Sequence, residues 1–358
     1  MRHSDTSMVP VQMATNTLTH AIVIAATAFL NTLNASQRAQ VEFAFCPQKT
    51  AIAAQFMGAS GRHAFVGEQY GQAVWSNFPV DDVPRPGLQL GGLEAYQRSA
   101  ALHLLQVLLS PEGYQKIVGI MDSDQVLSES GTPYAAGKAH YTLGIFGTPD
   151  NTAPWMLQFG GHHLALNAVI AGPNVTFTPM LTGAHPAVYA LNGRTVRPLG
   201  QETDKAFQLI NTFDLGQQQK AVLPDPVYDL VLGPGRDGET LSYQGLSTAE
   251  MTEAQQRLLL DLVSEWVGIG NADIAGPRMV KVRDDLRRTY FAWYGNTTYP
   301  SPVYFRITGP TLDIEFANQQ WNNQMPGVKA GGVNHIHTLY RDPTNDYGRG
   351  FTALNSHA

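Results

Sequence analysis

The sequence contains a single cysteine, Cys46, in 358 residues. One thiol cannot form an internal disulfide, and it cannot build a cysteine-rich zinc site or an iron–sulfur site. We interpret Cys46 as a small packed residue and not as a nucleophile. Histidine and carboxylate side chains are therefore the metal ligands that this chain can offer.

Positive charge is also scarce, with 23 Lys and Arg against 29 Asp and Glu and a net charge of −6. Neutralising nucleic-acid phosphates requires clustered basic residues, so we expect no nucleic-acid partner. No apolar run reaches the ~18 to 20 residues that a membrane-spanning helix needs, so we expect no membrane partner. The apolar stretch 21–30 has no cationic residues directly before it, as a signal peptide would, and we interpret it as a helix of a cytoplasmic protein.

The content of 43% hydrophobic residues is sufficient for a core. Helical spacing of apolar residues dominates the first part, whereas period-two alternation begins near residue 141. We therefore predict an α+β fold with a helical N-terminal part packed on a mainly antiparallel sheet. Residues 1–16 are expected to be a flexible N-terminus, and 17–358 a single domain, helix-rich over 17–138 and β-rich over 139–358.

A candidate metal site lies near the end of the sequence. Apolar and polar residues alternate over 303–308 and 312–316, which predicts two strands, and a third is expected over 333–340. Residues two apart in a strand share a face, so His335 and His337 should point the same way, about 7 Å apart. If this strand lies beside the one that carries Glu315, two imidazoles and a carboxylate meet, as in non-haem iron and catalytic zinc sites.

His162 and His163 follow two glycines and precede an apolar run. In a regular strand these adjacent side chains would point to opposite faces, unless the glycines distort the backbone. We expect one of them to face the metal, with His163 as a further ligand, and either one to act as an acid–base group. The alternative is that both are histidines satisfied within a core.

Other residues are candidates for a substrate pocket and for supporting roles. Residues 62–90 are punctuated by proline and glycine, which predicts a long ordered loop over a cleft. Asp342 is a candidate for orienting an imidazole and Arg341 for binding a substrate carboxylate; the alternative is that both fix the chain end. The pocket candidates are Trp75, Arg85, Asn167, His185 and Arg306.

The segment 233–238 has the glycine spacing of a dinucleotide-binding loop. The residues after it do not begin a helix, and Pro234 removes a backbone donor where a phosphate would need one. We predict a turn here.

Several segments together resemble the family known as domain of unknown function 3500. The resemblance spans nearly the whole chain and implies a single domain, but no particular reaction. The segments that carry it are Trp75-Ser-Asn-Phe-Pro79, Leu109-Ser-Pro-Glu-Gly-Tyr114, Gly161-His-His-Leu164, Thr178-Pro179, Tyr304-Phe-Arg-Ile-Thr-Gly-Pro310, Ile314-Glu315, Asn334-His-Ile-His337, Arg341-Asp-Pro343 and Asp346-Tyr-Gly348.

The residues favour a metal-dependent enzyme that acts on a small-molecule substrate. We expect a non-haem metal oxidoreductase or oxygenase with a divalent transition metal, iron first, then zinc, manganese or copper. The alternatives are a zinc-dependent hydrolase and a non-catalytic protein that binds a small molecule. The sequence does not define an oligomeric state.

Overall fold

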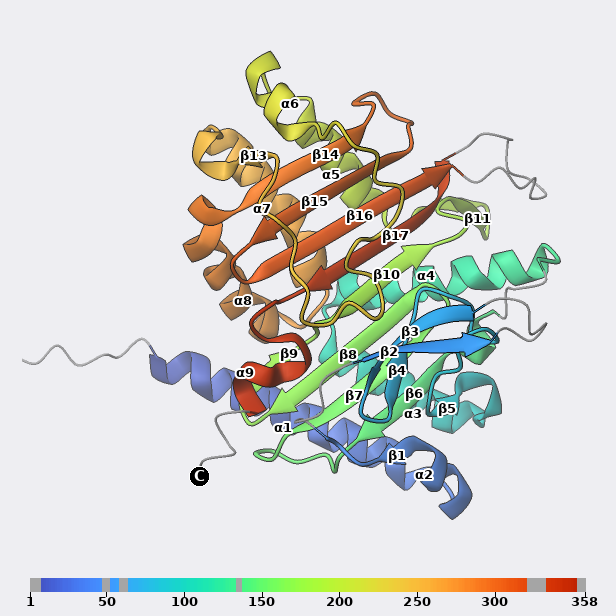
Figure 1. Cartoon of the computed structure of the whole chain (residues 1–358). Helices are drawn as coiled ribbons and strands as arrows, with labels where there is room; N and C mark the ends of the chain where they lie inside the picture. The colour runs from blue at the N-terminus through green and yellow to red at the C-terminus, as the bar shows by residue number, and fades with distance from the viewer. Residues whose placement is uncertain (1–7, 47–51, 58–63, 133–136, 321–332, 353–358) are drawn as a thin grey trace, which may run out of the picture.

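The computed structural model describes residues 8–46, 52–57, 64–132, 137–320 and 333–352 (Figure 1). Within these residues, one large sheet carries helices on one face, so the fold is α+β. Every strand pairing in the large sheet is antiparallel except that of β1 with β6. In spatial order its strands are β1 (Glu42–Phe43), β6 (Thr142–Phe146), β7 (Trp155–Gly161), β8 (Leu164–Ala171), β10 (Met180–Ala184), β17 (Val333–Arg341), β16 (Leu312–Gln320), β15 (Val303–Gly309), β14 (Tyr290–Gly295) and β13 (Leu246–Ser247), with β5 (Leu88–Gln89) beside β6 and β9 (Asn174–Thr176) beside β8.

The remaining elements are helices and two small sheets. The helices are α1 (Met8–Asn31), α2 (Ala35–Val41), α3 (Ala95–Leu108), α4 (Pro111–Glu129), α5 (Gly200–Ile210), α6 (Leu215–Ala221), α7 (Glu253–Val267), α8 (Ala272–Asp285) and α9 (Arg349–Thr352). One small sheet consists of β2 (Ile52–Met57), β3 (Ala64–Tyr70) and β4 (Ala73–Trp75). The other consists of β11 (Tyr189–Leu191) and β12 (Arg194–Val196). Among the described helices, none is both long enough and apolar enough to cross a membrane.

The two faces of the large sheet are covered differently. On one face, Thr338 accepts a hydrogen bond from Trp266 of α7, and Tyr340 one from Arg278 of α8. The opposite face lies under the extended segment 222–245 and the sheet β2–β4, which cross in front of the large sheet in Figure 1. We call segment 222–245 the covering segment. Because side chains alternate along a strand, β17 presents His335, His337 and Arg341 to this second face.

The strands predicted over 303–308, 312–316 and 333–340 are confirmed as β15, β16 and β17. Asn34 caps the start of α2, and Ser110 caps the start of α4. The helix α1 begins at Met8, within the stretch 1–16, whose flexibility stays a prediction; residues 1–7 lie outside the described part. The expectation of a loop over 62–90 was wrong. This stretch contains β3, β4 and β5, because its alternating residues pair as strands.

Ser247 and Glu250 have the spacing of a capping box, but the box that opens α7 is formed by Thr252 and Gln255. Ser247 is instead paired with Tyr290 of β14, and residues after it make a single 3-10 turn (Thr248–Glu250). Pairing with the sheet thus takes precedence over the local capping pattern.

Candidate metal centre

His162 and His163 form the two-residue turn between β7 and β8, where Gly161 pairs with Leu164. His163 has a φ of 59°, which few residues other than glycine adopt. Both rings are buried, and they stack with centroids 3.8 Å apart. The expected alternation between the two faces does not apply here, because the pair forms the turn and does not continue a strand. Both imidazoles therefore reach the same region.

Glycines around this hairpin leave room for its aromatic neighbours. A Cβ on Gly161 would lie 2.9 Å from the ring of Tyr141, whose hydroxyl donates to the carbonyl of His162 at 2.6 Å. Gly183 of β10 pairs with His337, and a Cβ there would lie 2.6 Å from the carbonyl oxygen of Ile336 and 3.2 Å from Cβ of His163. The missing side chain of Gly183 is what lets the ring of His163 approach β17.

The structure brings His163, His335 and His337 together. One ring nitrogen of each lies within 4.8 Å of the others, and all three residues are buried. The Nε2 atoms of His163 and His335 are 3.0 Å apart. A tetrahedral zinc ion with Zn–N bonds of ~2.0–2.1 Å holds its nitrogens about 3.3 Å apart, so the spacing suits one metal ion. We call these three residues the histidine triad.

Asp229 of the covering segment orients one member of the triad. Its Oδ1 lies 2.8 Å from Nδ1 of His337. The Nε2 of His337 is buried and has no hydrogen-bond partner among the described residues. A carboxylate on one ring nitrogen is the usual support of a metal-binding histidine, because it fixes the ring and its tautomer. The sequence analysis missed Asp229, which is 108 residues away from His337 in a segment without regular secondary structure.

Burial keeps several of these imidazoles neutral. It lowers the pKa of His163 and of His335 well below the usual range, and the neighbouring histidines add to the effect. Burial, followed by His162 and His337, lowers the pKa of His185 to about 4. For Asp229, burial favours the neutral acid, but contacts with His337, the backbone of Leu230 and Gln319 together outweigh burial and lower the pKa. Neutral rings keep the lone pairs that a metal ion needs.

Two further histidines lie against the triad. The ring of His185 stacks on that of His335 with centroids 4.6 Å apart, so His185 is the one predicted pocket residue that adjoins the triad. His162 directs its Nδ1 to Oδ1 of Asp124 in α4, at 2.7 Å. Asp124 also accepts a hydrogen bond from the backbone of Gly137. His162 is thus held at one nitrogen while its ring lies against His163.

Glu315 is not brought to the triad. As predicted, β16 pairs with β17 and Glu315 shares the face of the histidines, but the register places it opposite Leu339, while Ala317 is opposite His337. Its carboxylate accepts hydrogen bonds from the backbone of Val231 and Leu232, both at 2.7 Å, and from Tyr304 at 2.6 Å. Glu315 therefore anchors the covering segment to the sheet.

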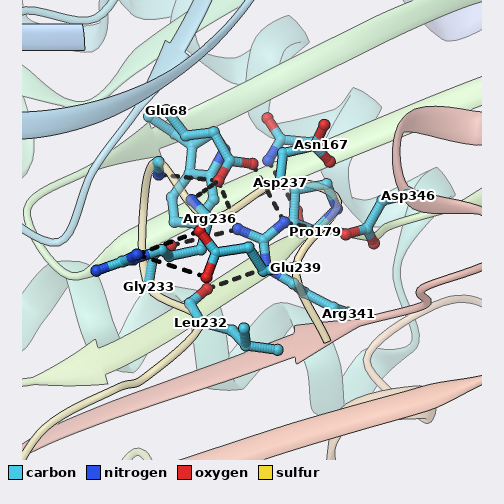
Figure 2. Close-up of polar contacts among 12 residues, drawn as sticks. Glu68, Asn167, Pro179, Leu232, Gly233, Arg236, Asp237, Glu239, Arg341 and Asp346 are labelled. Atoms are coloured by element: carbon cyan, nitrogen blue, oxygen red, sulfur yellow. Dashed lines mark hydrogen bonds and ion pairs between the residues drawn. The ribbon is translucent and has the colours of Figure 1, made fainter. Parts of the chain in front are cut away.

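Arg341 is also engaged elsewhere, in the group that Figure 2 draws. Its guanidinium lies 2.5 Å and 3.2 Å from the two carboxylate oxygens of Glu68 and 3.0 Å from Asp346. Glu68 accepts further hydrogen bonds from the backbone of Gly235, in the predicted turn, and from the hydroxyl of Tyr347. We call Arg341, Glu68 and Asp346 the arginine cluster. The arginine cluster joins the sheet β2–β4, the covering segment and the chain end.

The other predicted supporting residues bind the protein's own groups. Asp342 lies 3.3 Å from Arg278 and accepts a hydrogen bond from the hydroxyl of Thr344. The indole of Trp75 donates to Tyr347, Arg85 to the carbonyls of Ser76 and Pro79, Asn167 to the carbonyl of Pro179, and Arg306 to Gln244. These contacts are structural and leave the four pocket candidates outside the triad.

A cavity of about 680 Å³ lies near the residue that orients His337, although none of the three triad histidines is among the residues that line it. It lies between residues 227–229 of the covering segment and the ends of β14, β15 and β16. Asp229 lines the cavity and also bonds His337, and Gln319 lines it and pairs with His335 across the strands. The cavity is large enough for a small molecule, for which pockets of ~300–1,000 Å³ are usual.

The fold and site define an α+β protein with a buried group of three histidines, one of which is bonded to a residue of a cavity wall. The family described as "Protein of unknown function (DUF3500)" matches residues 60–349, and the chain belongs to this family. No curated protein and no solved structure matches the chain significantly. The family match includes the triad, Asp229 and the residues that line the cavity.

Proposed function

We propose that this protein is a metal-dependent enzyme that acts on a small molecule at the histidine triad. The observation that carries the proposal is the convergence of His163, His335 and His337 in a buried site, with His337 oriented by Asp229. The buried Nε2 of His337 has no partner among the described residues, and this costs free energy unless another group satisfies it. A metal ion is the group that three imidazole nitrogens at this spacing suit.

Zinc fits this donor set best. Catalytic zinc is commonly held by three protein ligands, including three histidines, with a fourth position left for water or substrate. A zinc ion in such a site lowers the pKa of a bound water to about 7 and so supplies a nucleophile for hydrolysis. His162, fixed by Asp124 and stacked on His163, is the residue proposed to hold and move a proton beside it.

An iron-dependent oxidoreductase is the second candidate. Imidazole also suits iron and copper, and Glu315 lies on the face of the sheet that carries the histidines. The two-histidine, one-carboxylate set expected from the sequence would require the carboxylate of Glu315 to leave Val231, Leu232 and Tyr304. We therefore place zinc before iron.

Elemental analysis of protein purified without a His tag tests this proposal. We expect about one zinc ion per chain, and loss of most of it in His163→Ala, His335→Ala and His337→Ala, because each variant removes a ligand. The fold should survive, since a domain of this size has an extensive apolar core of its own. His103→Ala, which changes an exposed histidine of α3, is the matched control and should keep its metal.

The same measurement separates the alternatives. Stoichiometric iron together with oxygen uptake would favour the oxidoreductase over the zinc enzyme. A wild-type protein that binds no transition metal, even after incubation with zinc or iron salts, would contradict the proposal and favour a non-catalytic binding protein.

A further inference from the structure

Asp229, which orients His337, belongs to a stretch of the covering segment that is poorly packed. From 224 to 231 no residue is buried, and the stretch has no regular secondary structure. The side chain of Asp229 is itself 45% exposed. Apolar packing therefore contributes little to the position of this stretch, and hydrogen bonds at its end have to hold it.

Glu315 supplies these hydrogen bonds at the end next to Asp229. Its side chain is fully buried, and its two oxygens accept from the backbone of Val231 and of Leu232, each at 2.7 Å. The hydroxyl of Tyr304 donates to the same carboxylate at 2.6 Å. Because Val231 follows Asp229 closely in the chain, a movement of its backbone also moves Asp229.

The two backbone groups require a carboxylate at position 315. Both are N–H donors, so each oxygen of Glu315 has to accept. A glutamine side chain has the same shape, but its NH₂ group only donates. Whichever way this amide turned, its NH₂ would face the N–H of Val231 or of Leu232. We therefore expect Glu315→Gln to release the covering segment near Asp229.

We infer that Glu315 is a positioning residue of the proposed metal site. By holding the backbone of Val231 and Leu232, it keeps the carboxylate of Asp229 on Nδ1 of His337, and so keeps the Nε2 of His337 directed into the triad. The effect on metal rests on the proposed function, but the link from Glu315 to His337 does not. Glu315 then acts on the metal without binding it, unlike the ligand expected from the sequence.

A double-mutant cycle of zinc affinity tests the inference with Glu315→Gln, Asp229→Asn and the double variant. We expect each single variant to weaken zinc binding about 10- to 100-fold, because each removes the support of a ligating histidine. The double variant should be weaker than Asp229→Asn by no more than about twofold, since losses multiply only when two changes act independently.

Two further variants make the cycle safe to interpret. Tyr304→Phe removes one donor from Glu315 and spares its carboxylate, so it gives the same test with a smaller change in the core. It should weaken zinc binding less than Glu315→Gln does, and only where Asp229 is present. Asp313→Asn is the matched control, because Asp313 is a buried carboxylate on the same face of β16. It should bind zinc as the wild type does.

Proton NMR measures the position of His337 without any metal. The hydrogen that Nδ1 of His337 donates to Asp229 should give a downfield signal, because a hydrogen held between an imidazole and a carboxylate is strongly deshielded. We expect this signal to be lost in Asp229→Asn and in Glu315→Gln. The signal of the hydrogen between His162 and Asp124 is the internal reference and should stay in both variants.

Three results would overturn the inference: a His337 signal that persists in Glu315→Gln, unchanged zinc affinity in that variant, or losses that multiply in the double variant, as they would if Glu315 bound the metal itself. The NMR signal also separates the inference from the proposed function. A protein that never holds metal but loses the His337 signal in Glu315→Gln would contradict only the enzyme. A metal-loaded protein that keeps both signal and affinity in Glu315→Gln would contradict only the role of Glu315.

Discussion

Strand β17 carries two buried polar groups on the same face, the histidine triad at one end and the arginine cluster at the other, and they differ in how their polar atoms are satisfied. In the arginine cluster, the guanidinium of Arg341 is shared between Glu68, Asp346 and the carbonyl of Leu232. In the triad, His337 keeps a buried nitrogen with no partner among the described residues. A satisfied network stabilises the fold, whereas an unsatisfied one indicates a place for a ligand.

The difference extends to what surrounds each group. The arginine cluster is enclosed by Trp75 and Tyr347, and burial raises the pKa of Asp346 to about 6 although Arg341 lowers it. The triad is held from outside by Asp229, which is itself partly exposed and lines a cavity. We therefore expect changes in the first group to act on stability and changes in the second to act on metal binding.

The largest effect is expected from Arg341→Leu. This change leaves Glu68 and Asp346 buried without their cation, which should lower the free energy of unfolding by about 3–5 kcal/mol. The loss should shrink in acid, where protonation removes the unpaired charges. Chemical denaturation at pH 5 and pH 8 measures both effects. Arg236→Leu, which removes an arginine from an exposed ion pair, is the control and should cost no more than about 1 kcal/mol.

If Arg341→Leu folded stably but lost its metal, the division between the two groups would be wrong, because the arginine cluster would then support the site directly.

An intermediate effect is expected from Gly183→Ala. The new methyl group would meet the carbonyl of Ile336 and the Cβ of His163, so β10 or the ring of His163 has to move. We expect a stability loss of about 1–3 kcal/mol from overpacking, together with weaker metal binding. Gly276→Ala in α8, where a Cβ meets nothing within 4 Å, is the matched control. Unchanged metal affinity in Gly183→Ala would show that His163 does not depend on this gap.

The smallest effect on stability is expected from Asp229→Asn. The amide keeps the shape of the side chain but removes the charge that orients His337, so metal affinity should fall about 10- to 100-fold with little change in unfolding. Competition with a metal-binding dye measures the affinity. Asp225→Asn, in the same covering segment and exposed, is the control. An equal loss in both variants would mean that the covering segment acts through its overall charge and not through His337.

The sequence by itself determined three of the strands around the site. Period-two alternation gave β15, β16 and β17, because a strand with one apolar face must alternate, and it placed His335 and His337 on one side. The expectation that Glu315, Arg306 and the two histidines share one sheet is confirmed. The family resemblance, too, followed from the order of short segments alone.

Only the tertiary structure decided which of these residues meet. The register between β16 and β17 placed Glu315 opposite Leu339, and a shift of pairing by two residues, which the alternation alone permits, would have placed it opposite His337. His163 reaches the triad because a tight turn replaces a continuous strand and because Gly183 leaves space for its ring. Asp229 joins through a chain path with no periodic pattern. Register, turn geometry and the course of an irregular segment depend on contacts between residues far apart in the sequence, which local spacing does not encode.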